Sequence, residues 1–264
     1  INQLIYELEQ VDNIFVHPAM GDSGLSLGSA ILTELKISVT DYLTNKYSFS
    51  NTFLGPNYSG ELEIFVQNFN YPYIQMNKMK NPEKDIAKLL FENKIVGLWN
   101  GRLEWGPRAL GNRSIILNTF DKGVNDSLNA RLNRTEFMPF APVVLDQIAK
   151  TYFPKYDEKV PAADYMTMTY DTAPEFHELL QATVHIDGTA RPQIAYKKTS
   201  PLYYGILKEF YKISGCAALV NTSFNAHEEP ILSDPSTAIN SLINGRVDYL
   251  VMENYLFKLK SEIK

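Results

Sequence analysis

Cysteine is almost absent from this sequence of 264 residues, with Cys216 as its single representative. One cysteine excludes an intramolecular disulfide framework and a zinc site built from cysteine clusters. Long apolar runs are also missing, because no stretch approaches the roughly 18 consecutive apolar residues of a membrane span. The N-terminus lacks a signal-peptide pattern. These absences predict a cytoplasmic protein that does not contact the membrane.

Several catalytic signatures are missing as well. The four histidines, His17, His177, His185 and His227, are far apart, with no His-Glu-x-x-His pair for a metal. There is no Gly-x-Ser-x-Gly turn, which argues against a serine hydrolase. The net charge of -5 argues against a nucleic-acid surface, although a local basic pocket for a small anion remains compatible with it.

Helical and strand patterns alternate along the chain, which predicts an α/β or α+β fold. Residues 1–75 differ in character from residues 76–264, and residues 42–73 read as a connecting segment. The chain begins at Ile1 without a methionine, so we expect it to be a piece of a longer protein. Helices are expected at 3–9, 25–35, 85–93, 124–132, 201–214 and 235–244, and strands at 13–17, 95–99, 114–117, 141–145, 165–170, 217–221 and 249–252.

Three segments carry residues suited to anion binding. Residues 101–114 combine glycines with Arg102, Arg108 and Arg113, and arginine offers a fork of donors for phosphate or carboxylate. The alternative for this segment is a surface loop with solvated arginines. Residues 185–193 contain Thr189 and Arg191 around an Asp-Gly turn, which also fits a plain hairpin.

The third segment is 221–225, where Asn221, Thr222 and Ser223 follow an apolar strand. Ligand contacts in α/β folds are commonly placed at strand ends. A polar strand end that caps the next helix is the alternative.

Taken together, these motifs resemble the O-carbamoyltransferase family, which includes the nodulation-factor, tobramycin and cephamycin carbamoyltransferases. The matching stretches occur in the family's order and cover nearly the whole chain. They are residues 15–30, 101–114, 128–142, 185–193, 221–225 and 229–231. The resemblance implies a YrdC-like mixed-sheet domain at 76–264. It also implies that residues 1–75 hold the C-terminal part of an actin-like ATPase-fold lobe and the connection.

The resemblance implies a role for particular residues. Arg108, Arg191 and Ser223 fall where the family contacts phosphate or carbamoyl phosphate, and we expect them to be catalytic. Asp22 falls where the actin-like lobe supplies a carboxylate to a divalent metal, expected to be Fe²⁺, which one carboxylate alone would not hold. The remaining expected contacts to substrate and ATP are Arg102, Arg113, Arg131, Arg134, Thr189, Asn221 and Thr222. Among these, Arg131 and Arg134 are candidate substitutes for family cations, since Met138 stands where many relatives carry an arginine.

The implied activity is an ATP-dependent O-carbamoyl transfer. Carbamoyl phosphate and ATP with Mg²⁺ would form carbamoyl-adenylate in the YrdC-like domain, and the actin-like lobe would pass the carbamoyl group to a hydroxyl acceptor. We expect the present chain alone not to complete the transfer, because most of that lobe is missing. Two alternatives remain open, a non-catalytic YrdC-like module that binds nucleotide or RNA and a degenerate interaction module.

Overall fold

The centre of the molecule is an eight-stranded mixed sheet with the order β1-β10-β9-β2-β3-β8-β4-β7. The computed structural model describes residues 1–40, 51–134 and 140–260. Strands β2 and β9 are parallel, as are β4 and β7, and the other neighbours are antiparallel. The strands are β1 Ile74–Lys78, β2 Val96–Trp99, β3 Arg113–Leu117, β4 Ala141–Leu145, β7 Gln193–Ala195, β8 Ala218–Ser223, β9 Tyr249–Met252 and β10 Tyr255–Leu259. The expected mixed α/β architecture is confirmed.

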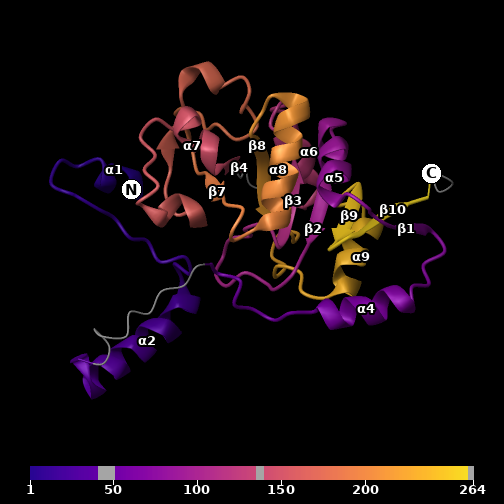
Figure 1. Cartoon of the computed structure of the whole chain (residues 1–264), viewed down its shortest axis with the longest axis horizontal. Coiled ribbons are helices and arrows are strands. Elements are labelled where there is room, and N and C mark those ends of the chain that lie inside the picture. The colour runs from indigo at the N-terminus through magenta and orange to yellow at the C-terminus, as the bar shows by residue number, and fades with distance from the viewer. Residues whose placement is uncertain (41–50, 135–139, 261–264) are drawn as a thin grey trace.

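Helices pack on both faces of the sheet (Figure 1). One face carries α5 Pro82–Phe91, α7 Asp146–Tyr152 and α8 Pro201–Ser214, and the other carries α4 Ser59–Gln67, α6 Val124–Arg131 and α9 Pro235–Ile243. Successive strand residues point to opposite faces. Leu98 and Ile116 therefore pack under α5 and α8, while Trp99 and Ile115 pack with α9. Burial on both sides explains why the central strands read as continuous apolar runs.

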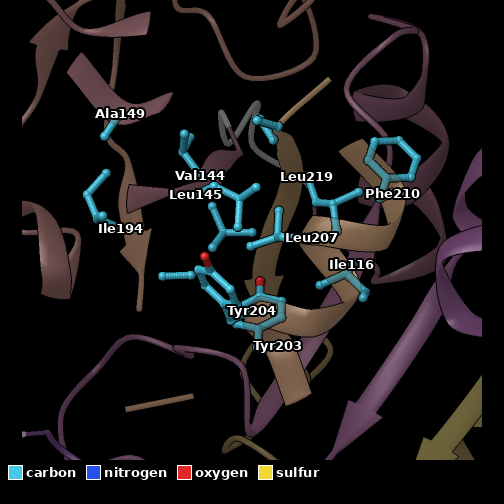
Figure 2. Packing of buried hydrophobic residues seen from close by; sticks show 14 of the residues in the cluster. Ile116, Val144, Leu145, Ala149, Ile194, Tyr203, Tyr204, Leu207, Phe210 and Leu219 are labelled. Atoms are coloured by element: carbon cyan, nitrogen blue, oxygen red, sulfur yellow. The ribbon is translucent and has the colours of Figure 1, made fainter. Parts of the chain in front are cut away.

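Helix α8 shows how the first face is filled (Figure 2). Its Tyr203, Leu207 and Phe210 point toward Val144 of β4 and Leu219 of β8. The helix begins with Pro201 in its first turn and ends at Gly215, whose φ of 75° is the left-handed conformation favoured by glycine at a helix end. These local signals match the predicted helix, and they fix α8 across the strands that position the site described below.

The first forty residues contain two helices in different surroundings. Helix α1, Asn2–Tyr6, lies near β5 through a hydrogen bond from Gln3 Nε2 to Asp171 Oδ1 (2.9 Å). Helix α2, Asp22–Ile37, has no buried residue and lies apart from the sheet (Figure 1). The division of the chain at residue 75 stays a prediction. In the described part of the chain, no helix is long and apolar enough to cross a membrane.

Two expected strands are absent from the described structure. Residues 13–17 are irregular. Within 165–170, only Tyr170 joins a strand, β5 Tyr170–Asp171, which pairs with β6 Thr189–Ala190. Before it lies the 3₁₀ helix η1, Pro161–Tyr165, and the backbone N–H and hydroxyl of Thr167 both donate to Ala162 O. These hydrogen bonds pair backbone groups within the turn itself, so this part of the segment does not depend on a neighbouring strand.

Candidate anion-binding site

A cavity of about 210 Å³ lies at the Ser223 end of β8, next to the start of β4. We call it the arginine pocket, after Arg108, Arg134 and Arg191, which all line it. It brings together six of the residues predicted from the sequence, from four separate segments of the chain. The full lining is Pro107, Arg108, Ala109, Arg134, Phe140, Ala141, Met166, Arg191, Asn221, Thr222, Ser223, Asn225, Ala226, His227 and Glu228.

The loop that carries Arg108 is held in shape by one carboxylate. Glu104 Oε1 accepts hydrogen bonds from the backbone N–H groups of Leu110 (2.8 Å), Asn112 (2.8 Å) and Arg113 (3.2 Å). Between them, Gly111 adopts a φ of 112° and lies against the Tyr203 ring. Three bonds to one partly buried carboxylate fix the backbone just after Arg108. Glu104 was missed in the sequence, because its role depends on a fold of the loop that residue types do not encode.

The three guanidinium groups of the arginine pocket have no carboxylate partner among the described residues. Across residues 1–40, 51–134 and 140–260, no carboxylate forms an ion pair with any of them. Burial, together with the neighbouring charge of Arg108, lowers the pKa of Arg191 to about 10. Burial likewise lowers the pKa of Arg108 and of Arg134. Like charges held together in a partly buried site attract an anion strongly.

Arg134 is oriented by two contacts. Its Nη1 donates to Thr222 Oγ1 (3.2 Å), and its guanidinium carbon lies 5.7 Å from the centre of the Phe140 ring. Contact with an aromatic face stabilises a cation without neutralising it. The guanidinium group of Arg134 is therefore held in one orientation and keeps its positive charge for a ligand.

The pocket also contains buried polar atoms that find no hydrogen-bond partner within the described ranges of the chain. They are one donor, Arg108 Nε, and two acceptors, Asn221 Oδ1 and Asn225 Oδ1. Such atoms are costly unless a ligand or water pairs with them. A fitting ligand would thus offer both acceptors and N–H or O–H donors. Asn225 was not singled out in the sequence, although it belongs to the predicted 221–225 motif.

Three predicted arginines lie outside the arginine pocket. Arg113 is fully buried, where its Nη1 donates to Asn112 O (2.9 Å) and its guanidinium carbon lies 4.1 Å from the Trp99 ring centre. Burial lowers the pKa of Arg113 to about 10. Arg102 Nε donates to Gly55 O (2.9 Å). Arg131 pairs with Asp248 at the surface (2.8 Å). In this structure these side chains hold segments of the protein together.

Thr189 and Asp22 also lie outside the pocket. Thr189 Oγ1 donates to Asp187 Oδ1 (2.8 Å) within its own turn. Asp22 begins α2, and among the described residues no three His, Cys, Asp or Glu side chains gather as a metal site. Asp22 alone does not make a metal site, and the Fe²⁺ that the resemblance implies for the full-length actin-like lobe stays a prediction. Met138 lies in 135–139, outside the described residues.

The lining of a smaller cavity, of about 40 Å³, includes Asp164, Tyr165, Leu110 and Gln193. Burial raises the pKa of Asp164 to about 6 from its ordinary 3.8. The folded state therefore binds the proton more tightly than the unfolded state does. The contribution of Asp164 to stability is most favourable below the unfolded pKa and falls as the pH rises from about 4 to about 6. Above that range Asp164 is ionised in both states, and the folded state is destabilised by the full cost of burying the carboxylate.

Asp164→Asn is expected to increase the free energy of unfolding by about 1 kcal/mol at about pH 8 and to have little effect at about pH 4. The neutral amide removes the cost of a half-buried carboxylate. Urea unfolding at both pH values measures the difference. Asp12→Asn, at an exposed aspartate, is the control. An equal effect of Asp164→Asn at both pH values would contradict the assignment.

Comparison with known proteins places the chain in a family. Residues 87–259, which include every described residue of the arginine pocket, match the family described as carbamoyltransferase C-terminus. The chain belongs to this family. The predicted resemblance to carbamoyltransferases is confirmed.

Relatives of the chain are considerably longer. An uncharacterized protein of Methanocaldococcus jannaschii is 34% identical over 98% of this chain and 42% of its own length. Nodulation protein NolO of Bradyrhizobium diazoefficiens is 31% identical over 94% of this chain and 45% of its own length. The chain thus spans less than half of these relatives.

Among solved structures, full-length HypF in its phosphate- and nucleotide-bound form is similar over 66% of this chain and 25% of that chain. It has 22% sequence identity and a TM-score of 0.48.

Proposed function

We propose that the chain is the C-terminal part of an ATP-dependent O-carbamoyltransferase and that its arginine pocket binds carbamoyl phosphate and ATP. The observation that carries this proposal is a set of three partly buried arginines around one cavity, none paired with a carboxylate in the described structure. A protein does not gather such charges for stability, because they repel one another. Membership of the carbamoyltransferase C-terminus family supports the choice of carbamoyl phosphate as an anion for this pocket.

Bringing two polyanions together is the main physical difficulty of this reaction. Arg108 and Arg191 lie close enough to interact electrostatically, so they would clamp a single phosphate group between them. Arg134 would offset the charge of the second substrate. The hydroxyl of Ser223 can donate to a phosphate oxygen. Mg²⁺, bound to the ATP phosphates, supplies further positive charge.

Positioning and charge stabilisation would account for catalysis, without a protein nucleophile. One water would cleave carbamoyl phosphate into carbamate and inorganic phosphate. A carbamate oxygen would then bond to the α-phosphorus of ATP as pyrophosphate leaves. The product is carbamoyl-adenylate.

Transfer to a hydroxyl acceptor belongs, in this proposal, to the whole protein. The relatives are more than twice as long as the stretch they share with this chain, and the actin-like lobe expected from the resemblance would lie in the additional part. We therefore expect the 264-residue chain to form the adenylate without carbamoylating an acceptor.

Pyrophosphate release tests the proposal directly. With carbamoyl phosphate, ATP and Mg²⁺ together, we expect pyrophosphate and inorganic phosphate in equal amounts, and carbamoyl-adenylate by mass spectrometry. Arg108→Met should lower the rate by about 100-fold, while Arg131→Met, at a surface arginine outside the pocket, should leave it unchanged. Pyrophosphate release without carbamoyl phosphate, or equal losses in the two variants, would contradict the proposal.

A further inference from the structure

Two buried side-chain amides are interlocked behind the arginine pocket. Gln193 is 3% exposed and Asn221 is 2% exposed. Gln193 Nε2 donates to Leu110 O (2.9 Å), and Gln193 Oε1 accepts from Asn221 Nδ2 (2.7 Å). The same Nδ2 also donates to Ala109 O (2.9 Å). The amide pair therefore ties β7 and β8 to the loop that carries Arg108.

Hydrogen-bonding rules fix which way each amide faces. A backbone carbonyl only accepts, so the NH₂ group of Gln193 must face Leu110 O and that of Asn221 must face Ala109 O. Rotating either amide by half a turn would set one oxygen against another. Asn221 Oδ1 is consequently the atom left over, and it is buried in a residue that lines the pocket, with no hydrogen-bond partner among the described residues.

This leftover atom has a chemical preference. Phosphate oxygens of an ionised ligand accept hydrogen bonds, so they do not satisfy a second acceptor. Asn221 Oδ1 instead requires an N–H or O–H donor. In carbamoyl phosphate the NH₂ group is that donor, and it is the feature that distinguishes this ligand from acetyl phosphate, in which a methyl group takes its place.

On the basis of the proposed function, we infer that Asn221 Oδ1 accepts a hydrogen bond from the carbamoyl NH₂ and thereby selects carbamoyl phosphate over acyl phosphates. Gln193 is the positioning residue, since its Oε1 holds the Asn221 amide in the orientation that presents Oδ1. An acyl phosphate would leave Oδ1 buried and unpaired. The arginines would bind the phosphate of either ligand. The amide pair would discriminate between the NH₂ group of carbamoyl phosphate and the methyl group of acetyl phosphate.

Calorimetric titration of the 264-residue chain with carbamoyl phosphate, acetyl phosphate and inorganic phosphate tests the inference. The unmodified chain should bind carbamoyl phosphate at least about tenfold more tightly than acetyl phosphate. Gln193→Leu should reduce that ratio to about two, while the affinity for inorganic phosphate stays the same. A merely structural role of Gln193 would weaken all three ligands together.

Gln181→Leu is the matched control. Gln181 is a partly buried glutamine whose Nε2, like that of Gln193, donates to a backbone carbonyl, that of Phe120, whereas the Asn221 amide donates to Gln193 and Ala109. This variant should keep the full ratio. Equal affinities of the unmodified chain for carbamoyl and acetyl phosphate would overturn the inference alone, whatever Gln193→Leu does. Failure to bind any of the three ligands would overturn the proposed function as well.

Discussion

Replacing Arg191 with methionine is expected to weaken the binding of carbamoyl phosphate by about 100-fold, because a buried charge-assisted contact to phosphate is lost. Methionine keeps much of the apolar volume of the stem, so the change is mainly one of charge. The same variant should increase the free energy of unfolding by about 1 kcal/mol, since it removes the repulsion between Arg191 and Arg108. Calorimetry and urea unfolding measure the two effects.

Arg102→Met is the matched control for this prediction. Arg102 belongs to the same arginine-rich segment as Arg108, but its guanidinium donates to Gly55 O and Leu54 O rather than lining the pocket. We expect its loss to leave ligand affinity unchanged. Binding that survives Arg191→Met but fails in Arg102→Met would mean that the ligand lies elsewhere.

Gly111→Ala is expected to lower the free energy of unfolding by about 4 kcal/mol. An added Cβ would lie 2.3 Å from Tyr203 Cδ1, and the φ of 112° is one that side chains rarely adopt. Tyr203 is buried in the core under α8, so a shift of its ring would disturb the packing around it. Chemical denaturation monitored by circular dichroism measures the loss.

Gly245→Ala is the control that separates the cost of backbone strain from the cost of the steric clash with Tyr203. Gly245 also has a positive φ, 70°, but a Cβ there would meet nothing within 4 Å. Its substitution should therefore cost only the backbone strain, about 1 kcal/mol. Equal losses in the two variants would show that Tyr203 yields to the added methyl group.

Much of the sheet could be predicted from the sequence because its central strands are buried on both faces. Strands β4 and β9 match the expected ranges, and β2, β3 and β8 differ by one or two residues at an end. Helix α8 was equally clear from its proline and glycine boundaries. These elements carry their signal locally, as apolar runs or helix termini.

The sequence patterns did not predict the edge strand β1 or helix α4. The sequence of β1, Ile-Gln-Met-Asn-Lys, has mixed polarity, and it forms a strand because β10 pairs along its whole length. Helix α4 lies within the segment expected to be irregular, and its single buried residue is Leu62. Such elements depend on tertiary partners, which no local pattern reveals.

The candidate site was recoverable in part. Arg108, Arg191 and Ser223 come from motifs far apart in sequence, and the structure places all three on one pocket. Residue type could not separate them from Arg102 and Arg113, because an arginine that holds a loop and one that faces a cavity look alike in sequence. Gln193 went unnoticed because its role lies in the direction of its amide, which depends on two backbone carbonyls.

The pairing of β3 with β8 has a consequence for the order in which the protein forms. Ser114 is opposite Ser223, so the strand that follows the Arg108 loop waits for more than a hundred further residues to be synthesised. Such long-range contacts form slowly. On a ribosome, β2 and β3 would therefore emerge with apolar side chains still uncovered, a state prone to aggregation. The pocket could not capture an anion until synthesis had passed β8, because β8 supplies Asn221, Thr222 and Ser223 to its lining.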